Sequence, residues 1–168
     1  FLIAYLGIWV ISPKRLFAGN WKDELWLMAG GFFGGSLYFF TENTALGITQ
    51  ASNVAFIICT APLLTTILSL LFYKSEKATK GLIYGSILAL IGVGLVVFNG
   101  SFVLKLSPVG DLLTLLAALS WAFYSLVIKK MTGRYPTVFI TRKIFFYGVL
   151  TILPAFLLHP LQPDFDVL

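Results

Sequence analysis

Two long uncharged stretches, separated by a single acid, constrain the fold more than any other feature of this sequence. Residues 25–41 and 43–73 contain no Asp, Glu, Lys or Arg, and Glu42 stands between them. Charged residues make up only 11% of the 168 residues and hydrophobic residues 58%, whereas soluble domains carry about 25% charge. Apolar runs of this length are typical of helices that cross a lipid bilayer. The sequence therefore predicts an integral membrane protein.

Apolar segments alternate with polar loops, and each long segment predicts a transmembrane helix. The run 1–11 would reach only about 16 Å, and spanning takes about 20 residues. We expect it to be the end of a longer helix, so that the chain is a piece of a larger protein. The predicted fold is an all-α, polytopic membrane helix bundle with about five complete helices and one partial helix. The complete helices are expected at 24–46, 51–73, 81–98, 111–130 and 144–158.

Basic residues mark one side of the membrane. Eleven of the 12 Lys and Arg residues fall in the predicted loops 12–23, 74–80 and 129–143, and Lys105 alone falls elsewhere. Because basic loops stay in the cytoplasm, this alternation predicts a multi-pass protein of the cell inner (cytoplasmic) membrane with these three loops cytoplasmic. The same arrangement accounts for the net charge of +5, so nucleic acid is not an expected partner.

Glycines define the helix face on which Glu42 is expected. Intervals of four, three and four separate Gly31, Gly35, Tyr38 and Glu42. Residues at these intervals share one side of an α-helix, and paired glycines four apart let a neighbouring helix approach closely. We therefore expect Glu42 to face protein rather than lipid.

The role of Glu42 stays open between two interpretations. Glu42 lies 16 residues after Trp26, about 24 Å along a hydrocarbon core of about 30 Å, which places it near the outer surface. Glu42 and Asn43 could reach interfacial water or satisfy the turn expected at 47–50. Alternatively, Glu42 could bind substrate or a proton. Burying an acid at membrane depth costs free energy, and ionisable residues found there usually have a function.

A polar face is also predicted on the helix at 51–73. Asn53 and Thr60 are seven residues apart and lie on one side of this helix. Pro62 lacks an N–H group and clashes with the carbonyl of Ile58, which predicts a kink. Interrupted polar helices of this kind line binding sites in transporters, and we expect this face to line a cavity.

The helix at 111–130 places a second group of candidates in the membrane. Trp121 lies ten residues, about 15 Å, after Asp111 and is too deep for an interfacial aromatic belt. Trp121 and the nearby Tyr124 are candidate cavity residues. A packed tryptophan whose N–H group finds a partner is the equal alternative.

The sequence lacks the groups that catalysis needs. It has one histidine, no His-Glu pair at helical spacing and no glycine-rich phosphate loop. We expect no enzyme activity, no catalytic residue, no cofactor and no metal site.

Three motifs resemble the EamA-type permeases of the drug/metabolite transporter superfamily. The first is the Glu-Asn-x-Ala-Leu helix end at 42–46, followed by a short turn and the Ala-Pro pair at 61–62. The second is Glu76 before the glycine-rich helix at 81–98. The third is the Gly-Asp helix start at 110–111 with Ser-Trp-Ala at 120–122.

This resemblance implies ten helices in two inverted five-helix repeats around a central cavity. Residues 1–98 would be the C-terminal part of the first repeat, 99–107 the connecting loop, and 108–168 the N-terminal part of the second repeat. The implied function is secondary transport, typically export of amino acids, other small metabolites or drugs, by alternating access. The expected partners are a small-molecule substrate and the lipid bilayer; proton coupling and a homodimer are left open. The alternative function is a non-transporting membrane subunit that acts through helix packing.

Overall fold

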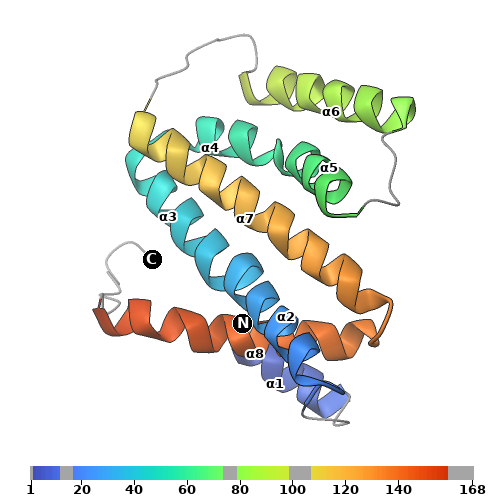
Figure 1. Ribbon diagram of the computed structural model, residues 1–168. Coiled ribbons are helices and arrows are strands. Elements are labelled where there is room, and N and C mark those ends of the chain that lie inside the picture. The colour runs from blue at the N-terminus through green and yellow to red at the C-terminus, as the bar shows by residue number, and fades with distance from the viewer. Residues whose placement is uncertain (1, 12–16, 74–78, 99–106, 159–168) are drawn as a thin grey trace.

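Helices make up almost all of the described chain (Figure 1). The computed structural model describes residues 2–11, 17–73, 79–98 and 107–158, and no strand occurs within these ranges. The predicted all-helical fold is confirmed. The elements are α1 (Leu2–Ile11), α2 (Trp21–Gly31), the π-helix η1 (Phe32–Leu37), α3 (Tyr38–Ile48), α4 (Ala51–Ile58), α5 (Ala61–Phe72), α6 (Lys80–Phe98), α7 (Pro108–Thr132) and α8 (Thr137–Leu158).

α7 is the central helix of the bundle and packs against α2, η1, α3, α4 and α5. Small side chains on α7 allow these neighbours to approach, and its buried residues include Gly110, Ala117, Ala118 and Ala122. The hydroxyl of Ser120, also buried, donates a hydrogen bond to the carbonyl of Phe33 at 2.8 Å. α7 therefore lies between α2, η1 and α3 on one side and α4 and α5 on the other (Figure 1).

α2, η1 and α3 follow one another without interruption and form one rod from Trp21 to Ile48. Asn20 caps its start, because the Asn20 side chain accepts the N–H of Asp23 at 2.7 Å and satisfies a helix-end donor. At 1.5 Å per residue the rod is about 40 Å long, which exceeds a hydrocarbon core of about 30 Å. The helix predicted at 24–46 lies inside this rod.

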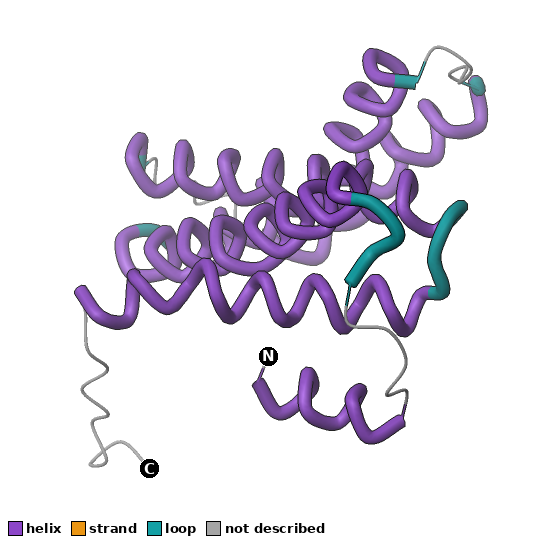
Figure 2. The backbone as a smooth tube through the Cα atoms, turned by 60° about the horizontal axis from the view of Figure 1, so that its bottom comes forward, coloured by secondary structure: helices purple, strands orange, loops and turns teal. Residues whose placement is uncertain are grey.

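α8 lies between the rod and α1 (Figure 2). Glycines make the contact with the rod: a Cβ atom on Gly31 would lie 2.5 Å from the Cβ of Tyr147, and one on Gly35 would lie 3.0 Å from the Cα of Gly148. Contacts below 3.0 Å are not tolerated without displacement. The glycine face predicted from the sequence thus serves the packing of the rod on α8.

The helix predicted at 51–73 is divided into α4 and α5. α4 ends at Ile58 and α5 begins at Ala61, with Pro62 in its first turn. The hydroxyl of Thr60, at the break, donates to the carbonyl of Ile57 at 2.6 Å. The glycine-rich α6 packs against α4, where Gly94 lies against the ring of Phe56.

Three helical stretches of the described chain are long and apolar enough to cross a membrane, by length and composition. They are Ala51–Phe72, Pro108–Thr132 and Thr137–Pro154, and α6 contains the shorter apolar stretch Ile83–Gly92. These stretches support a polytopic membrane bundle, and the rod and α6 are helical where the sequence predicts two further spanning helices.

The loop predicted over 129–143 is wrong. α7 continues to Thr132 and α8 begins at Thr137, so the connection between the helices is short. Arg142 and Lys143 lie within α8 and are only 3% and 5% exposed. Their charge made the segment look like a loop in the sequence, whereas an ion pair and contacts with aromatic rings compensate their burial. The helix predicted at 144–158 therefore begins two turns earlier.

Candidate functional site

Four side chains from the rod and α7 form a polar aromatic cluster, called here the Glu42 cluster: Tyr38, Glu42, Trp121 and Tyr124. The ring centroids of Tyr38 and Trp121 are 5.0 Å apart, and those of Trp121 and Tyr124 are 5.1 Å apart. The hydroxyl of Tyr38 donates a hydrogen bond to Oε1 of Glu42 at 3.0 Å. Tyr38 thus links Glu42 to Trp121 and Tyr124, which the sequence places on a different helix.

Gly34 allows the ring of Tyr124 to pack against the backbone of η1. A Cβ atom on Gly34 would lie 2.3 Å from Cδ2 of Tyr124, so a residue with a side chain here would displace the ring. The ring of Tyr124 therefore rests directly on the backbone of η1. This close approach fixes the distance between the rod and α7 at the level of the cluster.

The π-helix η1 separates two faces that the sequence predicted to be one. Gly31 and Gly35 lie against α8, whereas Tyr38 lies against Trp121 on α7. The prediction of a single face is wrong because it assumed 3.6 residues per turn throughout, and a π-helix holds more residues in each turn. π-helical segments are rare in proteins, and those that occur are often located at functional sites.

The geometry of the Glu42 cluster suits the recognition of a solute. Trp121 is 39% exposed, so its ring is accessible, and the half-buried Glu42 carboxylate accepts one hydrogen bond from Tyr38 and keeps further acceptor capacity. Aromatic faces bind apolar groups and cations, and a carboxylate binds a proton or an amine. The cluster can therefore contact both parts of a small amphipathic molecule.

The other predicted site residues lie outside the Glu42 cluster. Asn43 is exposed, and its amide nitrogen donates to the carbonyl of Phe39 at 2.7 Å. Asn53 is 1% exposed in α4, which packs against α7. Thr60 and Pro62 lie at the break between α4 and α5. The structure thus buries Asn53 on α4, a helix that packs against the same central helix α7, and leaves Asn43 on the surface.

A buried ion pair joins α2 to α8 at the opposite end of the rod, about 27 Å from Glu42 along its axis. The ammonium group of Lys143 binds Oε1 of Glu24, and the two side chains are 6% and 8% exposed. The hydroxyl of Tyr147 donates to the same oxygen, and the N–H of Ala18 donates to Oε2 at 2.8 Å. Glu24 is therefore fully engaged, as a buried charge must be.

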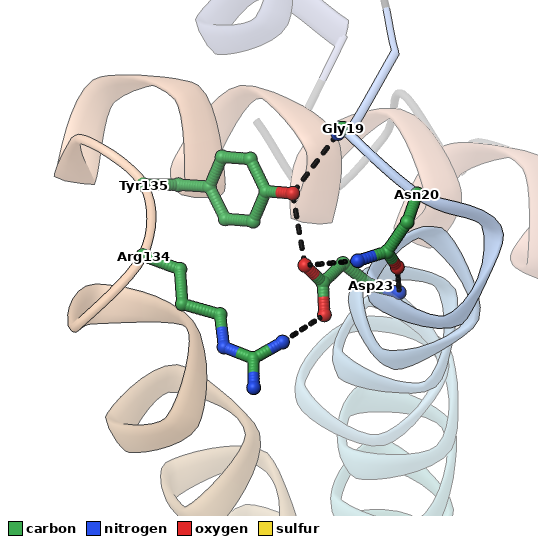
Figure 3. A network of polar contacts seen from close by, with 5 residues as sticks. All are labelled: Gly19, Asn20, Asp23, Arg134 and Tyr135. Atoms are coloured by element: carbon green, nitrogen blue, oxygen red, sulfur yellow. Dashed lines mark hydrogen bonds and ion pairs between the residues drawn. The ribbon is translucent and has the colours of Figure 1, made fainter.

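A second ion pair lies beside the first, between Asp23 and the α7–α8 connection (Figure 3). Arg134 binds Oδ1 of Asp23 at 2.8 Å, and the hydroxyl of Tyr135 donates to Oδ2 at 2.9 Å. The N–H of Gly19 donates in turn to the Tyr135 oxygen at 2.9 Å. Burial raises the pKa of the Tyr135 hydroxyl, and the Asp23 carboxylate adds to this effect, so Tyr135 stays a donor. We call Asp23, Glu24 and their partners the charged cluster.

The sequence contains a signal for the charged cluster. Two adjacent acids, Asp23 and Glu24, begin one apolar helix, and two adjacent bases, Arg142 and Lys143, precede another apolar run. Opposite pairs at helix ends on the same side of a membrane can neutralise one another. The location of the bases in a supposed loop concealed this pairing.

The bundle combines apolar spanning helices, a half-buried carboxylate beside aromatic rings, and buried ion pairs at one end. These features define a multi-pass membrane protein. The chain belongs to the EamA-like transporter family, whose sequence profile matches residues 1–98. A relative from Bacillus subtilis, named uncharacterized transporter YdfC, is 34% identical over 79% of this chain and 42% of its own length. A protein from Archaeoglobus fulgidus, named uncharacterized transporter, is 26% identical over 92% of this chain and 51% of its own.

The chain spans about half the length of the curated relatives that it matches. No solved structure matches it.

Proposed function

We propose that this chain forms part of a secondary transporter that exports a small organic solute, such as an amino acid, another metabolite or a drug, across the cytoplasmic membrane. The observation that carries the proposal is the Glu42 cluster, in which a carboxylate and three aromatic rings meet between apolar helices. Membership of the EamA-like transporter family supports it.

Alternating access assigns different roles to the two ends of the rod. The Glu42 cluster contacts the solute or takes up a coupling proton, and Asn53 extends the cavity along α4. The charged cluster closes the cytoplasmic end by holding α2 against α8. Transport then requires that this contact opens while the cluster at the other end closes.

The proposed organisation follows the two-repeat scheme of the family. Residues 1–98 belong to the first repeat, 99–107 connect the repeats, and 108–168 begin the second. The extent of the profile match supports the first boundary. In this scheme α7 carries Trp121 and Tyr124 of the second repeat to Tyr38 and Glu42 of the first, so the site lies between the repeats.

The first experiment identifies the solute and tests transport itself. Metabolites are compared in the medium of cells that lack or overproduce the full-length protein. Export is supported by a solute whose concentration in the medium falls in cells that lack the protein and rises in cells that overproduce it. Glu42→Gln and Asn53→Ala are then expected to reduce its flux at unchanged membrane abundance, and unchanged flux in both variants would remove these residues from the mechanism.

A non-transporting subunit is the second candidate, favoured by α6. A Cβ atom on Gly81, Gly85 or Gly92 would meet nothing within 4 Å, so this face is uncovered by the described residues, and a helix of a partner or of a second copy in a homodimer would fit against it. This alternative predicts a stable partner in detergent and no change in metabolite export on deletion. The medium comparison therefore distinguishes the two functions.

A further inference from the structure

An aromatic pocket of about 320 Å³ lies between α2, η1, α5 and α7, away from the Glu42 cluster. Its walls include Trp26, Phe33, Phe72 and Phe123. The rings of Phe33 and Phe123 stack at 5.4 Å, and Phe72 meets Phe123 edge-on at 6.3 Å. The volume is at the lower end of the range of ligand pockets, about 300–1,000 Å³.

Lys130 is the charged residue of the pocket lining, and the end of the pocket that it lines is called here the mouth. The ammonium group of Lys130 lies 3.7 Å from the centroid of the Trp26 ring. Lys129, one residue earlier, lies 5.3 Å from the ring of Tyr73, which also lines the pocket. Within the described residues, no carboxylate forms an ion pair with Lys130. A cation therefore stands at the entrance of an apolar pocket with its charge uncompensated by this part of the chain.

The charge and the apolar walls are ordered along the helix axes. Phe33 follows Trp26 by seven residues and Phe123 precedes Lys130 by seven, so both phenylalanines lie about 10 Å along the helix axes from the charged mouth, toward the middle of the bundle. The mouth is at the end of the bundle that carries the charged cluster. Phe72 is 64% exposed and Trp26 is 41% exposed, so the pocket opens sideways at the surface of the bundle.

We propose that this pocket binds an anionic phospholipid of the leaflet next to the charged cluster. The acyl chain occupies the aromatic pocket, and the phosphate binds the ammonium group of Lys130, with Lys129 beside it. A lipid matches the site because its charge and its chain lie in the same order as Lys130 and Phe123 do along the helix axes. Basic pockets between transmembrane helices on the cytoplasmic side bind such headgroups.

Native mass spectrometry of the full-length protein in detergent tests this proposal with phosphatidylglycerol and phosphatidylcholine. Phosphatidylglycerol is expected to bind at least about fivefold more tightly, because one lysine near an anionic headgroup contributes about 1 kcal/mol. Lys130→Gln is expected to abolish this preference. Lys80→Gln, at the exposed start of α6, is the matched control and is expected to keep it.

A second variant and a soluble competitor distinguish the contribution of the lipid headgroup to binding from that of the acyl chain. Ala29→Phe fills the pocket, which Ala29 lines, and is expected to weaken binding of both lipids. Glycerol phosphate, which lacks an acyl chain, is expected not to displace phosphatidylglycerol. Equal binding of the two lipids, a preference that survives Lys130→Gln, or displacement by glycerol phosphate would overturn the proposal. These readouts do not involve solute flux, so they are independent of the transport function.

Discussion

The carboxylate of Glu24 on α2 and the ammonium group of Lys143 on α8 form an ion pair from which water is almost completely excluded. Lys143 lies 119 residues further along the chain, so the pair joins distant segments. The hydrogen bonds from Tyr147 and Ala18 satisfy the remaining acceptor capacity of the carboxylate. This pair holds the rod against α8 at the end of the bundle that the distribution of basic residues predicts to face the cytoplasm.

Removing one member of this pair is expected to destabilise the protein strongly. Glu24→Gln or Lys143→Met leaves the other charge buried without a partner, at a cost of about 3–5 kcal/mol. The double variant is expected to be more stable than either single variant, because no charge is then left unpaired. Thermal unfolding of the purified full-length protein measures this, and a double variant less stable than both single variants would contradict it.

In the neighbouring ion pair, substitution of Arg134 and substitution of Asp23 are expected to lower the free energy of unfolding by different amounts. Arg134 is 54% exposed and Asp23 is 4% exposed at their side chains. Arg134→Gln should cost at most about 1 kcal/mol, as for exposed ion pairs. Asp23→Asn should cost more, because Asp23 also accepts a hydrogen bond from Tyr135. Equal losses of unfolding free energy in the two variants would show that the network is not centred on Asp23.

The glycine contact between the rod and α8 gives a steric prediction. Gly31→Ala places a Cβ atom 2.5 Å from that of Tyr147 and is expected to destabilise by about 1–3 kcal/mol, as overpacking does. Gly85→Ala in α6, where a Cβ atom meets nothing within 4 Å, is the matched control. It is expected to be neutral or stabilising, because alanine favours the helix. Unfolding midpoints that shift equally would argue against a close contact at Gly31.

The sequence predicted the helices well where hydropathy alone determines them. The stretches 51–73 and 81–98 are predicted correctly because they are mostly apolar and contain no charged residue. Sequence patterning does not predict the start of α8, because Arg142 and Lys143 are charged, and the burial of Lys143 depends on an acid far away in the sequence, Glu24. Local hydropathy contains no information about such a partner.

The Glu42 cluster was predicted only in part for a similar reason. The sequence groups Trp121 with Tyr124 on one helix and Tyr38 with Glu42 on another, but nothing in it predicts that the two groups meet. Their contact depends on Tyr38 and on the π-helix between Phe32 and Leu37, which rotates Tyr38 away from α8. A π-helix follows from packing between helices rather than from local residue preference, so an ideal helical period misplaced the face.

The hydrogen bond between Tyr38 and Glu42 is expected to contribute to transport. Tyr38→Phe keeps the ring against Trp121 but removes the donor. A hydrogen bond to a charged group contributes about 1.5–3 kcal/mol, so solute flux should fall about tenfold if the bond forms during the limiting step. Flux into proteoliposomes at matched protein content measures this, and a rate equal to that of the wild type would separate Tyr38 from the function of Glu42.

Solute flux in the Glu42→Gln variant of the full-length protein tests the central claim most directly. The control is Thr44→Ala, an exposed position two residues along the same helix. We predict that Glu42→Gln loses most of the flux of the solute identified in the medium, at unchanged membrane abundance and thermal stability, while Thr44→Ala keeps it. Equal flux in the wild type and in Glu42→Gln would contradict a transport role for the cluster.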